Sequence, residues 1–96
     1  VGGLNLDGTI GDLGLALALL SSIKNTGFKL ERTLLVGEVG LTGEIRPISS
    51  CDRLVKEAEK MGFKNAMVPQ RNKEKINSSI NIIGVSNLKE AIVKIF

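Results

Sequence analysis

The side chains most able to do chemistry lie in a glycine-rich stretch, Gly37–Pro47, which holds two carboxylates, Glu38 and Glu44, and one arginine, Arg46. A glycine loop that binds nucleotide phosphate must lead into a helix N-terminus, often with a Lys-Ser/Thr pair at its end. Here two carboxylates flank the glycines and would repel phosphate, and a strand-like segment follows. The stretch therefore predicts a glycine-bent β segment or hairpin and argues against a nucleotide loop.

Two arginines are the candidate binding residues, and each has a carboxylate close by in the sequence. Arg46 lies two residues after Glu44, and Arg53 follows Asp52 at the start of an expected helix. A guanidinium in such a position either pairs with its neighbouring carboxylate or contacts a nucleic-acid backbone, which requires only positive charge facing the phosphates. Both alternatives stay open, and we take Arg46 and Arg53 as candidate DNA-binding residues.

Other reactive side chains offer little. The chain has no His, and its single Cys51 has no partner base in sequence, although its place near a helix start predicts a lowered thiol pKa. One cysteine and no spaced oxygen-ligand loop predict no metal site. A further basic group is most simply a solvated loop surface: Lys64, Arg71, Lys73 and Lys75.

Length and composition indicate one small globular domain over residues 1–96. Apolar residues make up 43% of the chain and charged residues 24%, with a net charge of +3. No apolar run reaches the roughly 20 residues of a membrane span, so we expect no membrane association. A lone cysteine fits a reducing compartment, which predicts a cytoplasmic protein. The absence of an initiator Met suggests a piece of a longer protein.

Hydrophobic periodicity and turn residues predict an α/β (or α+β) fold, with helices packed on a mixed sheet. The first helix is apolar nearly all round and should be covered on most sides. A serine should cap the second helix, and Asn87 with Glu90 should cap the last. The expected helices cover Gly11–Lys24, Ser49 or Ser50 to Gly62, and Asn87 onward; the expected strands cover Val1–Leu6, Thr33–Val36, Ala66–Val68 and Ile80–Val85, with the bent segment over Val39–Ile48.

A family resemblance is carried chiefly by Leu35–Ile48, Leu-Val-Gly-Glu-Val-Gly-Leu-Thr-Gly-Glu-Ile-Arg-Pro-Ile. With Val1-Gly-Gly3, Ser21-Ser22 and the run from Lys56 to Pro69, it resembles the C-terminal Lon-protease-like domain of the RadA/Sms family, bacterial DNA repair and recombination ATPases. The resemblance spans essentially the whole chain. It implies a fold like the Lon protease catalytic domain, incomplete at its N-terminus because the family's domain begins earlier.

The resemblance also raises the Ser–Lys peptidase chemistry of Lon, in which a neutral Lys accepts the proton of a Ser hydroxyl. Aligned with that family, the nucleophile position is Ile10 and the base position is Leu54. Neither side chain can transfer an acyl group, so we expect no catalytic residue and a non-proteolytic domain. An active Lon-family Ser–Lys peptidase domain remains the alternative.

The same resemblance implies a role in a larger assembly. Family members carry a zinc-binding N-terminus and a RecA-like ATPase core, so ATP, Mg and Zn would belong to upstream domains and no cofactor to this one. They form ring hexamers, which makes this domain an oligomerisation scaffold and an auxiliary surface for single-stranded DNA or recombination intermediates. A protein-interaction module without DNA affinity is the other alternative.

Overall fold

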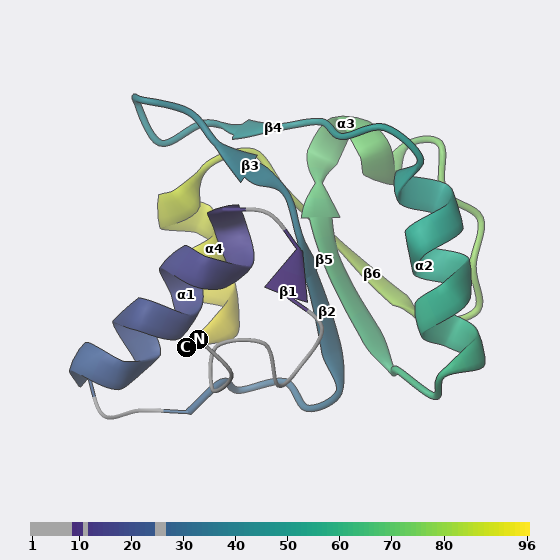
Figure 1. Ribbon diagram of the computed structural model, residues 1–96, viewed down its shortest axis with the longest axis horizontal. Helices are drawn as coiled ribbons and strands as arrows, with labels where there is room; N and C mark the ends of the chain where they lie inside the picture. The colour runs from purple at the N-terminus through teal and green to yellow at the C-terminus, as the bar shows by residue number, and fades with distance from the viewer. Residues whose placement is uncertain (1–8, 11, 25–26) are drawn as a thin grey trace.

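The computed structural model describes residues 9–10, 12–24 and 27–96 (Figure 1). The strand expected over Val1–Leu6 lies outside these residues. None of the described helices is long and apolar enough to span a membrane. In chain order the elements are β1 (Thr9–Ile10), α1 (Asp12–Lys24), β2 (Thr33–Val36), β3 (Glu38–Val39), β4 (Ile45–Arg46), α2 (Cys51–Lys60), β5 (Asn65–Pro69), α3 (Gln70–Lys73), β6 (Asn81–Val85) and α4 (Leu88–Ile95).

Four of the strands form a parallel sheet in the order β1-β2-β5-β6. Leu35 of β2 pairs with Met67 of β5, which in turn pairs with Ile83 of β6. Parallel neighbours require a crossover, and the connections here contain α1, α2 and α3 in turn. The predicted α/β class is confirmed.

The expectation of one mixed sheet is wrong. β3 and β4 pair antiparallel with each other in a separate two-stranded sheet. The chain leaves the parallel sheet at Gly37, where φ is +153°, and a Cβ there would lie 3.0 Å from Ile45 Cγ2. The Gly37 carbonyl oxygen also accepts a hydrogen bond from the Leu13 N–H at 3.0 Å. Glycine thus lets the chain turn out of the sheet directly over the start of α1.

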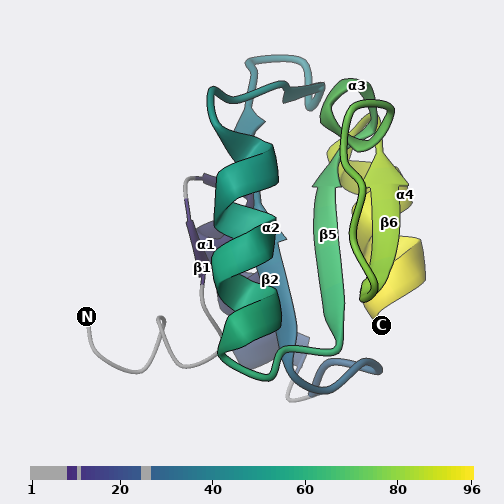
Figure 2. The same ribbon diagram turned by 90° about the vertical axis from the view of Figure 1, so that its right-hand side faces the viewer.

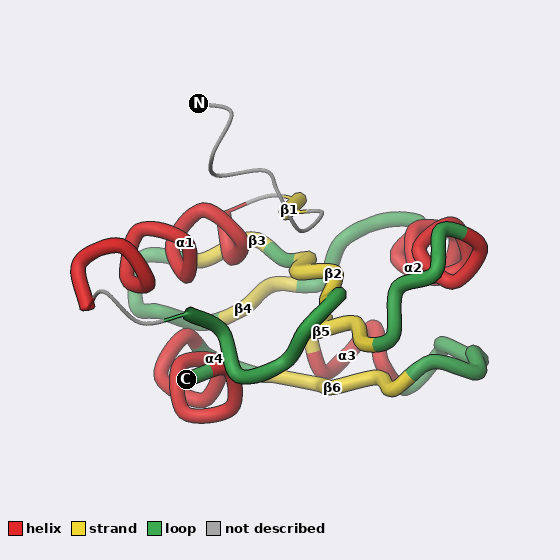
Figure 3. The backbone as a smooth tube through the Cα atoms, turned by 90° about the horizontal axis from the view of Figure 1, so that it is seen from below, coloured by secondary structure: helices red, strands yellow, loops and turns green. Residues whose placement is uncertain are grey.

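The helices cover the sheet on both sides: α1 and α4 lie on one face and α2 on the other (Figures 2 and 3). Successive side chains of β2 point to opposite faces, so Leu35 joins the α1–α4 side while Leu34 and Val36 join the α2 side. The first cluster contains Leu13, Leu17, Leu35, Ile45, Met67, Val85, Ala91 and Ile95; the second contains Leu34, Val36, Cys51, Val55, Ala58, Ala66 and Val68.

The start of α2 differs from the expected serine cap. Ser50 is the N-cap residue, but its side chain makes no capping hydrogen bond. Its backbone is left-handed, with φ of 58°, and its carbonyl oxygen accepts from the N–H groups of Arg53 and Leu54. At the other end Gly62, with φ of +87°, terminates the helix as predicted.

The capping of α4 follows the prediction with one change of partner. The Asn87 side chain accepts a hydrogen bond from the Glu90 N–H at 2.8 Å. The Glu90 carboxylate accepts from the Ser86 N–H at 2.7 Å, one residue before the expected partner. The two bonds satisfy backbone donors at the helix entrance and fix the direction in which the chain enters α4.

Coverage of α1 is less complete than its composition suggests. Leu13 and Leu17 are fully buried, but Leu19 is 49% exposed. The expectation that this helix is covered on most sides is therefore wrong at Leu19. The cause is that only the sheet and α4 side supply packing partners among the described residues.

This difference gives a matched pair of variants. Leu17→Ala should lower the free energy of unfolding by about 2–5 kcal/mol, because it removes methyl groups from a packed core. Leu19→Ala should lower it by about 1 kcal/mol or less, because about half of the residue stays exposed to water. Urea denaturation of both variants measures the difference, and equal losses would contradict the assignment of the buried face.

Candidate nucleic-acid interface

The carboxyl ends of the parallel strands meet at one edge of the sheet, which is where open α/β sheets bind ligands. β5 passes directly into α3, and β6 passes through Ser86 into the start of α4. The β3–β4 hairpin is fastened to the same edge, because the Ile45 N–H donates to the Ser86 carbonyl oxygen and the Leu88 N–H donates to that of Gly43, both at 2.8 Å. This edge therefore brings together the hairpin, α3 and the start of α4.

The hairpin turn is organised by the Glu44 carboxylate. Its Oε1 accepts hydrogen bonds from the Thr42 N–H at 3.1 Å and from the Thr42 hydroxyl. A Cβ on Gly40 would lie 2.0 Å from Glu44 Oε2, so any other residue there would displace the carboxylate from this position. Gly43 has φ of +87° and closes the turn with a hydrogen bond from its N–H to the Gly40 carbonyl oxygen at 3.0 Å. The prediction of a glycine-bent hairpin is confirmed.

Arg46 forms the carboxylate pair that the sequence left as one of two alternatives. Its Nη2 lies 3.2 Å and its Nε 3.4 Å from Glu44 Oε2. The two side chains are 59% and 43% exposed, so solvent reaches the pair. An exposed pair of this kind contributes at most about 1 kcal/mol to stability. The Arg46 guanidinium is therefore accessible to solvent, and breaking its ion pair with Glu44 would cost little free energy.

These contacts set the charge of Glu44. The hydrogen bond from the Thr42 hydroxyl, then that from the Glu44 N–H, then the Arg46 contact lower the pKa of the Glu44 carboxyl from 4.5 to about 2. All three favour the ionised form. Glu44 is therefore an anion throughout the neutral range and holds Arg46 by charge as well as by hydrogen bonds.

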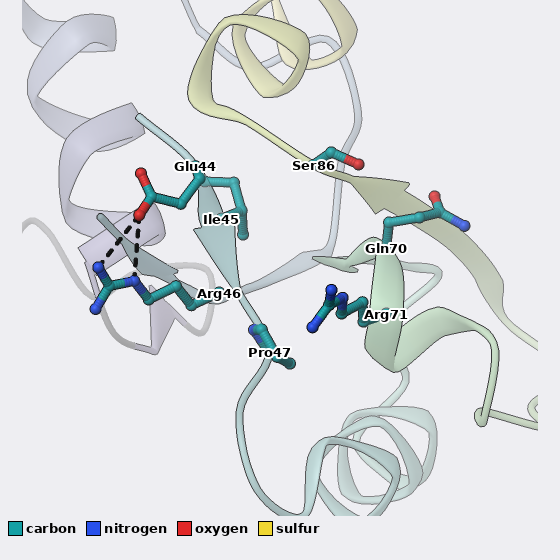
Figure 4. A pocket seen from close by; sticks show the side chains of 7 residues that line it. All are labelled: Glu44, Ile45, Arg46, Pro47, Gln70, Arg71 and Ser86. Atoms are coloured by element: carbon teal, nitrogen blue, oxygen red, sulfur yellow. Dashed lines mark hydrogen bonds and ion pairs between the residues drawn. The ribbon is translucent and has the colours of Figure 1, made fainter. Parts of the chain in front are cut away.

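Arg46 lines a pocket of about 330 Å³, and Arg71 lines the same pocket (Figure 4). The sequence predicted Arg71 only as part of a solvated loop surface and not as a binding residue. The four basic residues expected on a solvated loop, Lys64, Arg71, Lys73 and Lys75, are indeed exposed. Arg71 differs from a simple loop residue because α3 begins where β5 ends, beside the hairpin. The signal that could have found it is its place two residues after the buried Pro69, at the carboxyl edge of a parallel sheet.

Arg53 lies elsewhere. It belongs to the first turn of α2, it is exposed, and its side chain makes no ion pair within the described residues. The ion pair with Asp52, one of the two alternatives that the sequence leaves open, is not formed. Arg53 is not among the residues that line the Arg46 pocket. The two candidate arginines therefore do not share that pocket.

The two positions aligned with a Ser–Lys dyad lie on neighbouring parts of the fold. Ile10 ends β1, where its backbone pairs with Val36 of β2. Leu54 is half-buried on α2 and packs against the cluster that contains Val55. A dyad needs a hydroxyl and an amine that can exchange a proton. Both positions carry hydrocarbon side chains instead.

The expectation of an activated cysteine is wrong. Cys51 is buried, and desolvation, followed by the negative charge of Asp52, raises the pKa of its thiol to about 11. A helix start stabilises a thiolate only where the sulfur keeps access to water and positive charge. In the part of the chain that the structure describes, no three His, Cys, Asp or Glu side chains are placed to hold a metal ion.

With this geometry in place, comparison with known proteins defines the class. Residues 2–72 match the family model described as subunit ChlI of Mg-chelatase. The chain belongs to this family.

Within that setting the chain is similar to several proteins named DNA repair protein RadA. It is 41% identical over 93 residues to that of Halalkalibacterium halodurans, covering 95% of this chain and 20% of the relative. It is 43% identical over 98 residues to that of Pseudomonas aeruginosa, covering 100% and 21%, and 43% identical over 94 residues to that of Escherichia coli, covering 96% and 20%. The resemblance to RadA is confirmed, and the chain spans about one fifth of the length of these relatives.

The Glu44 contacts predict a titration that can be measured directly. Followed by NMR, the Glu44 carboxyl should titrate at about pH 2, and Thr42→Val should move its pKa toward 4.5 because the hydroxyl donor is lost. Because the pKa is lower in the folded protein, this stabilisation is complete above the unfolded value and is lost as the pH falls toward 2. Thr42→Ser keeps a hydroxyl and serves as the control. A Glu44 pKa that is equal in all three proteins would contradict the proposed hydrogen bond.

Proposed function

We propose that this chain is a non-proteolytic, Lon-like domain of a RadA-type DNA repair and recombination protein, acting as an oligomerisation scaffold and an auxiliary DNA-contact surface. The observation that carries the proposal is a sequence identity of about 40% to proteins named DNA repair protein RadA over nearly the whole chain. Ile10 and Leu54, which stand where a peptidase would need a hydroxyl and an amine, support the absence of proteolysis.

The architecture is compatible with a Lon-like domain. A parallel sheet covered by helices on both faces gives a rigid body whose loops at one edge are free to contact partners. Fold alone does not determine activity, because function depends on the residues placed at the site. At the edge described above those residues include two arginines, Arg46 and Arg71, and one carboxylate, Glu44.

In the longer protein that we propose, the motor lies outside this domain. A RecA-like ATPase core would use ATP and Mg to move along single-stranded DNA, and a zinc-binding segment would hold Zn. This domain would contribute no cofactor and would help hold a homohexameric ring in the cytoplasm. Its net charge of +3 favours a polyanionic partner.

DNA contact would fall to Arg46 and Arg53. Both side chains are exposed, and Arg53 has no carboxylate partner among the described residues. Arginine suits this task because its planar fork of donors matches the oxygens of a phosphate. Contacts to the backbone position a strand without reading its sequence.

The absence of proteolysis has a direct test. Incubated with casein, the protein should release no peptides, because neither half of a Ser–Lys dyad is present at its expected position. Gel electrophoresis over many hours measures this, with an active Lon protease as the positive control. Casein turnover that disappears when a Ser or Lys of this chain is replaced would establish the peptidase alternative instead.

Alanine variants of the protein, expressed from its whole gene, test the DNA contact. Arg46→Ala and Arg53→Ala should each weaken binding to single-stranded DNA, uniformly over sequence, and reduce the salt slope by about 0.7. Both should leave the melting temperature almost unchanged, because exposed pairs add little stability.

Lys64→Ala is the control, because it removes one charge at the amino end of β5, opposite the proposed edge. Wild-type DNA binding by both arginine variants at two salt concentrations would remove the DNA-contact role. The domain would then act as an interaction module without DNA affinity.

A further inference from the structure

The pocket between the hairpin and α3 is built from three segments that end or begin at the carboxyl edge of the sheet. The return strand of the hairpin contributes Arg46 and Pro47, α3 contributes Gln70 and Arg71, and Ser86 follows β6. In Figure 4 the Arg71 guanidinium extends toward Pro47, while the Arg46 guanidinium is turned to Glu44. Both arginines line one cavity of about 330 Å³, but only the Arg71 guanidinium points toward the opposite wall, because that of Arg46 is held beside Glu44, away from Arg71.

The walls of this pocket are held rigidly. The side-chain amide of Asn72 in α3 donates to the Ile48 carbonyl oxygen at 3.0 Å, and its oxygen accepts from the Ile48 N–H at 2.9 Å. The Ile45 N–H donates to the Ser86 carbonyl oxygen at 2.8 Å. These bonds tie α3 and the end of β6 to the same segment of chain, so the pocket exists before any ligand binds. Preorganised walls reduce the entropy lost on binding.

The charges in the pocket are unequal. Arg46 is neutralised by Glu44, but the Arg71 side chain has no hydrogen bond or ion pair within the described residues. Lys73 lies on the same short helix, and its Cδ would be 2.9 Å from a Cβ on Gly84, which places its stem against the end of β6. The rim therefore carries an excess of positive charge with one arginine uncommitted.

We propose that this pocket binds one phosphodiester group of single-stranded DNA, with Arg71 as the main ligand and Arg46 as a second. Glu44 acts as a built-in counter-ion: it holds Arg46 over the hairpin until phosphate arrives, and Arg46 then exchanges the carboxylate for a phosphate oxygen. Both anions are bound by the same guanidinium donors, so they compete. This inference rests on the proposed DNA contact and adds Arg71 and Glu44 to it.

The experiment measures binding of a fluorescent single-stranded oligonucleotide to the protein as its gene encodes it, by anisotropy at two salt concentrations. Arg71→Ala should weaken binding by about two- to fivefold at the lower salt and reduce the salt slope by about 0.7. Arg71→Lys keeps the charge without the planar fork and should lose less. Glu44→Gln should strengthen binding, because it removes the competing negative charge while keeping a hydrogen-bond acceptor for Thr42.

Three results would overturn the proposal. Arg71→Ala could bind like wild type while Arg53→Ala binds weakly, which would leave the DNA-contact function standing and remove this pocket from it. Lys64→Ala could lose as much affinity as Arg71→Ala, which would mean that only net charge matters. Glu44→Gln could leave affinity unchanged, which would exclude the exchange of partners at Arg46.

Two further measurements distinguish a loss of DNA affinity from a loss of fold, and a DNA ligand from free phosphate. The melting temperature of each variant shows that a loss of affinity is not a loss of fold, since the substituted side chains are all solvent-accessible. Inorganic phosphate, added as a competitor, separates the two sources of the ligand. Chemical-shift changes at Arg71 with phosphate but none with the oligonucleotide would overturn a DNA site. If Arg46→Ala, Arg53→Ala and Arg71→Ala all bind DNA like wild type, the DNA-contact role of the proposed function fails together with this pocket.

Discussion

The burial of β2 and β5 on both faces is the constraint on which the rest of this structure depends. Leu35 and Met67 face α1 and α4, while Leu34, Val36 and Val68 face α2, and all of them are at most 4% exposed. A shift of one residue in the pairing would send each of these side chains to the opposite layer. The register is therefore fixed by packing, and with it the position at which each strand ends. The loops that carry polar chemistry begin from those ends.

At that edge a single carboxylate connects local geometry with charge. Glu44 closes the hairpin through Thr42, occupies the space that Gly40 leaves free, and holds Arg46. The same hydrogen bonds that shape the turn keep Glu44 ionised, so the hairpin stays closed and the arginine stays oriented over the neutral pH range. Arg71 of α3 lines the same pocket as the hairpin, and the hydrogen bonds of Asn72 with the backbone of Ile48 hold α3 in this place.

The architecture of this chain is separate from the Ser–Lys peptidase chemistry that its resemblance to Lon raises. Ile10 and Leu54 lie on β1 and α2, in positions set by the same sheet, and carry only hydrocarbon. In the function that we propose, binding to DNA falls to exposed arginines on the loops and helix ends that this architecture positions. Backbone phosphates can be held by such side chains without a deep, enclosed site.

The sequence by itself determined the features that depend on near neighbours. Hydrophobic periodicity predicted α2 and α4, and the pattern from Asn87 to Glu90 predicted the start of α4. The glycines predicted the hairpin. The motif over Leu35–Ile48 indicated the resemblance to RadA. The tertiary structure alone decided that the four-stranded sheet is wholly parallel, that Leu19 is exposed, that the Cys51 pKa is raised and that Arg46 and Arg71 share a pocket. The reason is physical. Capping and turns are set by residues within a few positions, whereas sheet order, burial and the meeting of two distant arginines depend on which segments pack together.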